Sequence, residues 1–88
     1  MNVEITKKFQ KQVGNCTDIR IKSEIKQIIE KADLAKTISD IRNIKKLKGH
    51  RNIFRIRLGD YRIGLVISGN SIIFAAFDHR SDIYKYFP

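Results

Sequence analysis

The sequence predicts a single α+β domain over residues 1–88, in which two helices pack on one face of an antiparallel β-meander. The chain has 88 residues, which is the size of one domain. Apolar residues recur with helical spacing in the first half, and from Ile53 onward the spacing changes to two, as in strands. Two glycine-containing turns divide this second region into three segments.

The first two predicted elements are a short strand and a short helix. Val3 and Ile5 alternate with polar neighbours, which is typical of a strand. Thr6 is a suitable N-cap for a helix over residues 7–13, and Gly14 with the following asparagine is a stop signal for that helix.

The second helix is predicted behind Asp18, another N-cap candidate. The apolar stripe that follows is spaced i, i+4, i+7, i+8 and i+11, and consists of Ile21, Ile25, Ile28, Ile29 and Ala32. This stripe predicts a helix of about 15 residues that covers the sheet. Residues 37–44 predict one further helical turn, because Ile38, Ile41 and Ile44 recur every third position.

The C-terminal half predicts a three-stranded antiparallel meander. Its strands span residues 53–58, 61–67 and 72–78. The turns between them, Gly59-Asp60 and Gly69-Asn70, contain glycine, which adopts positive φ without steric cost. Residues 81–87 predict a short terminal helix that ends at Pro88.

A two-residue turn at Gly59-Asp60 would fix the register of the first two strands. Arg57 would then face Arg62 and Arg55 would face Gly64, so the three arginines share one surface, here called the arginine face. The opposite, helix-covered face would carry Phe54, Ile56, Leu58, Ile63, Leu65 and Ile67. Continued alternation would add Phe74 and Ala76 to the helix-covered face, and Ile73, Ala75 and Phe77 to the arginine face.

The chain is strongly basic, with 18 Lys and Arg against nine Asp and Glu and a net charge of +9. Between positions 42 and 62 there is one acid, Asp60, and there are eight bases: Arg42, Lys45, Lys46, Lys48, Arg51, Arg55, Arg57 and Arg62. Like charges facing each other across strands cost up to about 1 kcal/mol, so their presence suggests an anionic ligand.

RNA or DNA is the ligand that this charge pattern favours. Phosphates would contact the basic side chains, and Phe77 and Tyr84 would be available to stack on bases. We expect Lys45, Lys46, Lys48 and Arg51 to contribute to RNA binding. An acidic protein segment would satisfy the same charge.

Cysteine and histidine are scarce, which limits other chemistry. Cys16 is the single cysteine, so no internal disulfide forms, and His50 and His79 cannot complete a zinc cluster with it. We expect no metal and no cofactor. The sequence contains no signal peptide and no membrane span, so we expect a cytoplasmic protein without a membrane partner.

Three stretches of the sequence are recognisable. They are residues 46–49 (KLKG), 54–62 (FRIRLGDYR) and 78–84 (DHRSDIY). With them the chain resembles the RelE/ParE superfamily of toxins from type II toxin–antitoxin modules. The order of the predicted elements agrees with that family's fold over nearly the whole chain.

The resemblance implies an mRNA interferase, an endoribonuclease that in RelE-like members acts on codons in the ribosomal A site. It also implies a cognate acidic antitoxin that wraps around the basic face, and a toxin–antitoxin complex that binds operator DNA to repress its own promoter. The family's catalytic roles fall on Arg55, Arg57, Arg62, Arg80 and Tyr84.

The chemistry can be argued from the substrate. The 2′-OH of RNA can attack the adjacent phosphorus and leave a 2′,3′-cyclic phosphate and a 5′-OH. Guanidinium groups, here Arg62 and Arg80, would stabilise the charge on the phosphorane, while Tyr84 would stack on a base or orient a proton donor. Arginine is a poor general base, and RelE-like members often have lysine where this chain has Arg55 and Arg57. Histidine titrates near neutrality, which makes His79 a candidate acid or base.

Three alternatives remain open from the sequence. A ParE-like member of the superfamily would inhibit DNA gyrase and cleave no RNA. A nucleic-acid-binding module would use the same basic residues for phosphate contacts alone. The chain could also be an inactive copy, because one sequence does not show whether its site has been kept.

Overall fold

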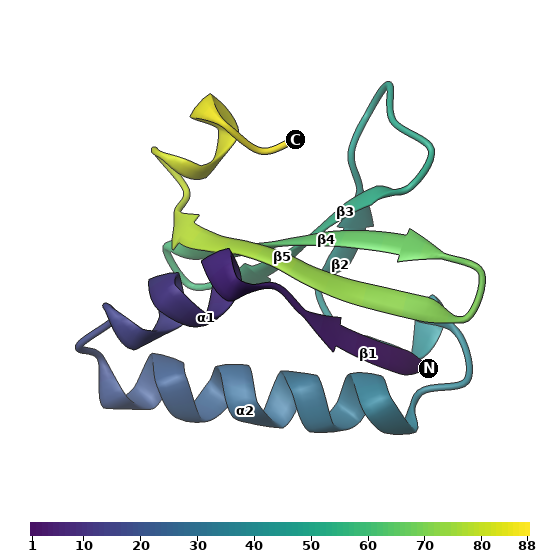
Figure 1. Ribbon diagram of the computed structural model, residues 1–88, viewed down its shortest axis with the longest axis horizontal. Coiled ribbons are helices and arrows are strands. Elements are labelled where there is room, and N and C mark those ends of the chain that lie inside the picture. The colour runs from purple at the N-terminus through teal and green to yellow at the C-terminus, as the bar shows by residue number, and fades with distance from the viewer.

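Both predicted helix caps form, and the helices they begin cover one face of a five-stranded sheet (Figure 1). The computed structural model describes residues 1–88. The strands are β1 (Asn2–Ile5), β2 (Ile44–Lys46), β3 (Ile53–Leu58), β4 (Tyr61–Ser68) and β5 (Ser71–His79). The helices are α1 (Lys7–Gly14) and α2 (Ile19–Leu34), with 3-10 turns η1 (Ile38–Asp40) and η2 (Ile83–Lys85). The predicted α+β class is therefore confirmed.

The two helices begin where side-chain oxygens replace missing backbone acceptors. The Thr6 hydroxyl accepts the N–H of Phe9 at 3.1 Å, and α1 follows. The Asp18 carboxylate accepts the N–H groups of Arg20 and Ile21 at 3.0 and 3.2 Å, and α2 follows. No helix is long and apolar enough to cross a membrane.

The sheet has the order β1-β5-β4-β3-β2, in which β1 runs parallel to β5 and the other neighbours are antiparallel. Arg57 faces Arg62 and Arg55 faces Gly64, so the predicted register of β3 and β4 is confirmed. Gly59 has a φ of 59°, as the turn between these strands requires.

Strand β2 was not predicted from the sequence. The expected helical segment 37–44 forms only the single turn η1, and Ile44 instead pairs with Ile56 of β3. Asn43 has a φ of 62°, which is incompatible with helix continuation and redirects the chain along the edge of the sheet. The three-residue spacing of Ile38, Ile41 and Ile44 predicts a helical turn, but it fits a turn followed by an edge strand equally well.

The faces expected for the side chains in the second half of the last strand are wrong. A β-bulge shifts the register between Gly64 and Leu65, which face Ala76 and Phe74, so Ala75 is an extra residue. Side-chain parity therefore switches after Ala75. Phe77 lies on the helix-covered face opposite Ile63, and Ala76 lies on the arginine face.

The main hydrophobic core lies between the sheet and the helices, as the apolar stripe of α2 predicts. Its fully buried side chains include Phe9, Ile56, Ile63, Leu65, Ile72 and Phe74. Ile25 and Ala32 of α2 are also buried against it. Burial on this side commits the other face of the sheet to the arginines.

A second, small core forms on the arginine face and consists of Ala76, Ile83 and Phe87. The predicted terminal helix is replaced by η2, after which the chain ends on the side of the sheet away from α2 (Figure 1). Residues 80–88 are here called the tail. A Cβ on Gly64 would lie 2.5 Å from Cε2 of Phe87, so the phenyl ring occupies the space that a side chain would need.

This close approach predicts that Gly64→Ala destabilises the protein by about 1–3 kcal/mol, because the Phe87 ring must move. Urea unfolding measures the change. Gly14→Ala is the matched control, since no atom lies within 4 Å of the new Cβ, and we expect it to be neutral or stabilising by up to about 1 kcal/mol. In a Phe87→Ala background the cost of Gly64→Ala should fall, and an unchanged cost would contradict the contact.

Candidate nucleic-acid interface

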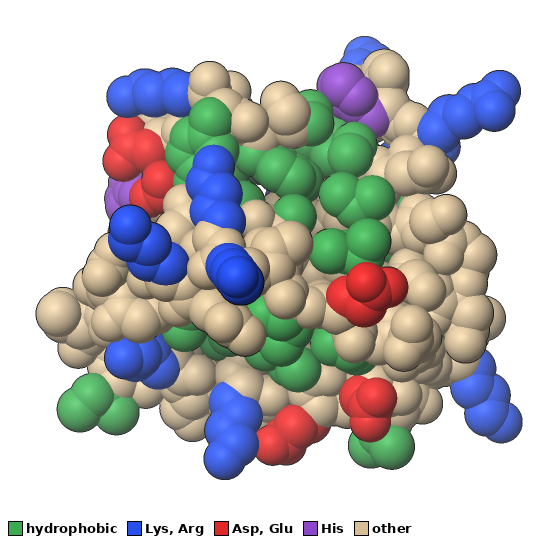
Figure 2. All heavy atoms as spheres, in the orientation of Figure 1, with side chains coloured by type: hydrophobic (Ala, Val, Ile, Leu, Met, Phe, Trp, Pro, Cys, Tyr) green, Lys and Arg blue, Asp and Glu red, His purple; other side chains and the backbone are tan.

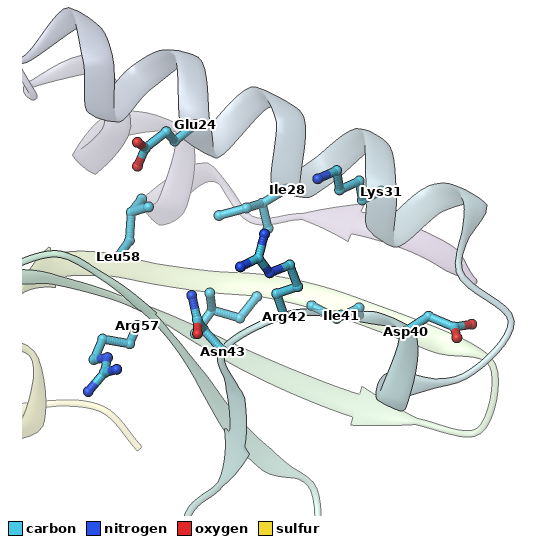
Figure 3. A pocket seen from close by; sticks show the side chains of 10 residues that line it. Glu24, Ile28, Lys31, Asp40, Ile41, Arg42, Asn43, Arg57 and Leu58 are labelled. Atoms are coloured by element: carbon cyan, nitrogen blue, oxygen red, sulfur yellow. The ribbon is translucent and has the colours of Figure 1, made fainter.

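Strand alternation places the arginines on the side of the sheet opposite α2. Figure 3 shows the Leu58 side chain pointing toward α2 and the neighbouring Arg57 side chain pointing to the other side. Arg55 lies two residues earlier on β3 and Arg62 faces Arg57 from β4, so all three share this face. The sequence therefore brings three guanidinium groups together by register alone.

The hollow drawn in Figure 3 is not the site of these groups. It has a volume of about 270 Å³ and lies between α2 and β3. Glu24 and Asp40 line it together with Arg42, and the side chain of Arg57 points away from it. Lys31 lines it as well, so this hollow has a lining of mixed charge and not the purely basic lining that a polyanion favours.

A second hollow, of about 240 Å³, lies at the junction of β2 and β3 and is purely basic in charge. It is lined by Lys45, Arg55 and Arg57, together with Asn43 and Ile44. Lys45 faces Arg55 across the strand pair, so the unexpected strand β2 adds a fourth cation to the arginine face. No acidic side chain lines this hollow, which suits a phosphate group.

The cations of the arginine face have no carboxylate partner. The one ion pair in the structure joins Lys85 to Asp82 at 3.2 Å. Arg55 donates through Nη1 to the carbonyl of Asn43 at 2.9 Å, and Arg62 donates through Nη1 to the carbonyls of Gly59 and Tyr61, both at 2.8 Å. Neutral carbonyls fix these guanidinium groups without cancelling their charge, so the face keeps its positive potential.

The backbone places Arg80 close to Arg62. Its N–H donates to the carbonyl of Asp60 at 2.8 Å, next to the Gly59 carbonyl that accepts from Arg62. Tyr84 follows on η2 and is 49% exposed, without a hydrogen-bond partner in the protein. The two residues that the resemblance singled out after β5 are therefore available to a ligand.

Histidine 79 does not join the arginines. Its register partner is Tyr61, which places His79 on the helix-covered side, where its ring lies 5.9 Å from that of Tyr61 in an edge-on contact. Its Nδ1 accepts the N–H of Ser81 at 3.1 Å and lies 2.8 Å from the Ser81 hydroxyl. These contacts stabilise the turn after β5, so the expected acid or base role lacks support from the geometry.

Phe77 was wrongly expected to stack on RNA. It is 3% exposed and stacks on Tyr61 within the protein, with 5.1 Å between ring centroids. The bulge at Gly64 and Leu65 is the cause, because it turns Phe77 to the helix-covered face. A bulge leaves no periodic signal in the sequence, although a glycine inside a strand is a hint of one.

The remaining predicted RNA-binding residues lie in and beside the loop between β2 and β3. Lys46, Lys48 and Arg51 line a hollow of about 390 Å³ formed by this loop. Figure 1 shows that the loop rises on the same side of the sheet as the tail, and Figure 2 shows Lys, Arg and His side chains gathered there. Lys46 faces Phe54, so its parity is that of the helix-covered face. These bases are a separate patch beside the arginine face.

One acidic residue sits in the arginine row, because Asp78 of β5 faces Arg62. Its Oδ2 accepts the hydroxyl of Tyr86 at 2.9 Å, and its Oδ1 accepts the N–H of His79 at 2.8 Å. Gln12 donates to the same Tyr86 oxygen at 2.6 Å. Partial burial and the bond to the Asp78 carboxylate raise the pKa of Tyr86. Sequence reasoning missed this cluster, because Gln12 and Tyr86 are 74 positions apart.

No group of three or more His, Cys, Asp or Glu side chains is placed to hold a metal ion.

No protein-family model matches the sequence. The chain is 42% identical over 89 aligned residues to Toxin RelE3 of Methanocaldococcus jannaschii, and the match covers 100% of both proteins. This chain belongs to the RelE family of toxins.

Solved structures agree with the family assignment. The fold matches a chain of the RelB-RelE antitoxin-toxin complex from Methanococcus jannaschii with a TM-score of 0.82 and 40% identity, covering 97% of this chain and 99% of that one. It matches the toxin–antitoxin complex RelBE2 from Mycobacterium tuberculosis with a TM-score of 0.69 and 22% identity, over 90% and 96% of the two chains. The RelE-like fold expected from the sequence is confirmed.

The Tyr86 cluster predicts a pH effect. The pKa of Tyr86 lies above the ordinary value of 10.0, so its contacts stabilise the fold fully below pH 10.0 and lose this contribution as the pH rises through the raised pKa. Asp78→Asn removes the carboxylate that raises it, and we expect a lower pKa for Tyr86. The pKa of Tyr86 is measured by titrating the tyrosinate absorbance of each protein with pH and subtracting the titration of the same protein with Tyr86→Phe. An unchanged pKa would refute the bond.

Proposed function

We propose that this RelE-family chain is an endoribonuclease that cuts messenger RNA and inhibits translation. The observation that carries the proposal is the group of cations without a carboxylate partner on the sheet face opposite α2, namely Lys45, Arg55, Arg57 and Arg62. Family membership selects RNA among the anions that such a face would bind. Because messenger RNA on ribosomes would be the substrate, we place the protein in the cytoplasm.

The proposed reaction uses the nucleophile that RNA supplies. The 2′ oxygen forms a bond to the adjacent phosphorus, the bond from phosphorus to the 5′ oxygen breaks, and the products are a 2′,3′-cyclic phosphate and a 5′-OH. The proton of the 2′-OH leaves with a base, and the 5′ oxygen gains a proton. The protein must hold these atoms in line and stabilise the charge on the phosphorane.

Arginine side chains are suited to the second task. Arg57 makes no hydrogen bond through its side chain, and Arg62 uses one nitrogen for two carbonyls, so each keeps N–H donors for phosphate oxygens. Arg80 lies beside the same turn and would contact the adjacent phosphate. The exposed Tyr84 ring would stack on a base or orient a proton donor.

We further propose a cognate acidic antitoxin as the partner that controls the toxin. The Methanococcus jannaschii structure is an antitoxin–toxin complex of RelB and RelE. An acidic segment would neutralise the arginine face and compete with RNA for the same cations. We also propose that the toxin–antitoxin complex binds operator DNA. Toxicity and its neutralisation can be tested by expressing the chain with and without the adjacent gene. Mapping of transcript 5′ ends then shows whether messages are cut in either case.

The alternatives differ in their products. The relative with 42% identity is named a RelE toxin, which favours RNA cleavage over the gyrase inhibition of ParE-like members. A module that binds without cutting would show affinity and no turnover, and so would an inactive copy of the toxin. Purified protein with ribosomes and message separates the nuclease from these alternatives, because only the nuclease yields RNA with new 5′-OH ends.

Arg57→Ala should lower the rate of cleavage by about 100-fold, because a donor to the transition-state phosphate is lost. Primer extension on a translated message measures the rate. Arg20→Ala is the matched control, since Arg20 is exposed on α2 away from the arginine face. A message with 2′-deoxy at the cut site should stay intact with wild-type protein. Full activity of Arg57→Ala, or cutting of the deoxy substrate, would contradict the mechanism.

Lys45→Ala should weaken RNA binding and reduce the slope of log affinity against log salt by about 1, because one phosphate contact is lost. Fluorescence anisotropy with a short RNA at several salt concentrations gives the slope. Lys36→Ala, at an exposed position after α2, removes the same charge at a distance and should leave the slope unchanged. Equal slopes for the two variants would remove Lys45 from the interface.

A further inference from the structure

Asp78 and Arg62 face each other across β4 and β5 without forming an ion pair. Opposite charges at facing positions of an antiparallel pair normally attract and stabilise the sheet. Here the Arg62 guanidinium turns back to the carbonyls of Gly59 and Tyr61. The Arg62 guanidinium thus lies at the position facing the Asp78 carboxylate and is not neutralised by it.

The Asp78 carboxylate is occupied by other donors. Tyr86 donates its hydroxyl to Oδ2 at 2.9 Å, and the N–H of His79 donates to Oδ1 at 2.8 Å. Each carboxylate oxygen therefore has one hydrogen-bond donor, and neither donor is Arg62. Of the two donors, the backbone N–H of His79 is fixed by the strand, and only the phenol depends on a side chain.

Tyr86 is itself held by α1. Gln12 donates Nε2 to the phenol oxygen at 2.6 Å and accepts the N–H of Phe77 with Oε1 at 3.0 Å. Lys8 Nζ lies 3.9 Å from the centre of the Tyr86 ring, a cation–π distance. The next residue, Phe87, is seated on Gly64. Contacts from α1, β5 and the sheet thus fix one hydroxyl group.

We propose that Tyr86 is a positioning residue that holds the Asp78 carboxylate away from Arg62 and so keeps the Arg62 guanidinium free for an RNA phosphate. The inference rests on the proposed function, because it assigns Arg62 to RNA. Without the phenol hydroxyl, Oδ2 of Asp78 loses its donor, and Arg62 is the cation at the facing position. The new ion pair would compete with RNA.

A double-mutant cycle on RNA affinity tests the proposal, using a short RNA with 2′-deoxy at the cut site as probe. Tyr86→Phe should weaken binding by about fivefold, the size expected of one exposed ion pair. Asp78→Asn removes a negative charge and so strengthens RNA binding by some factor whether or not Tyr86 is present. The test therefore compares this factor in wild type with the factor in Tyr86→Phe. Asp78→Asn should strengthen binding about fivefold more in Tyr86→Phe than in wild type, which restores the lost affinity.

A purely structural role for Tyr86 gives a different result. Asp78→Asn would then strengthen binding by the same factor in wild type and in Tyr86→Phe, because its long-range effect does not depend on the tail, and that outcome would overturn the proposal. Tyr61→Phe is the matched control, since it keeps the ring that stacks on Phe77 and removes a hydroxyl without a hydrogen-bond partner in the protein, so affinity should be unchanged. Thermal unfolding of each variant compares their folded stability.

The two proposals fail in different ways. Wild-type protein that binds the deoxy probe but does not cut the matching RNA would overturn the nuclease and leave the cycle to decide the role of Tyr86. Equal affinities of wild type and Tyr86→Phe would overturn the role of Tyr86 and leave the nuclease intact. Proton–nitrogen NMR of the arginine side chains adds a readout without RNA, because the Arg62 signal should shift in Tyr86→Phe and return with Asp78→Asn.

Discussion

The register between β3 and β4 is the constraint on which the rest of the structure depends. A two-residue turn with positive φ at Gly59 aligns the strands so that one face is apolar and the other carries Arg55, Arg57 and Arg62. A slip by one residue would bury three guanidinium groups beneath α2 and expose the core side chains. The energy of hydrophobic burial therefore also fixes the position of the charges, and the site needs no separate scaffold.

Much of the fold could be predicted because its signals are local. Caps at Thr6 and Asp18, the stripe of α2 and the glycine turns are each written within a few residues, and all form as expected. Strand β2 and the bulge at Gly64 could not be predicted in this way. A three-residue edge strand is too short for a period, and an extra residue in a ladder depends on its partner strand.

The same distinction separates the site residues. Arg55, Arg57 and Arg62 follow from the register, and their shared face could be predicted. The positions of Phe77 and His79 could not, because both lie beyond the bulge, where parity switches. Contacts of the tail with α1 and with Gly64 join segments far apart in the sequence. Composition and spacing carry no information about such pairs, so the surroundings of Asp78 emerge only from the folded chain.

Strand β2 has a consequence for how copies of this chain behave toward one another. It ends the sheet on one side, and an unprotected sheet edge is a template for self-association into aggregates. This edge is only three residues long and carries two lysines, which repel a second identical edge. The lysines of β2 therefore protect this edge of the sheet from self-association, and in the function proposed above the same side chains would also contact RNA phosphates.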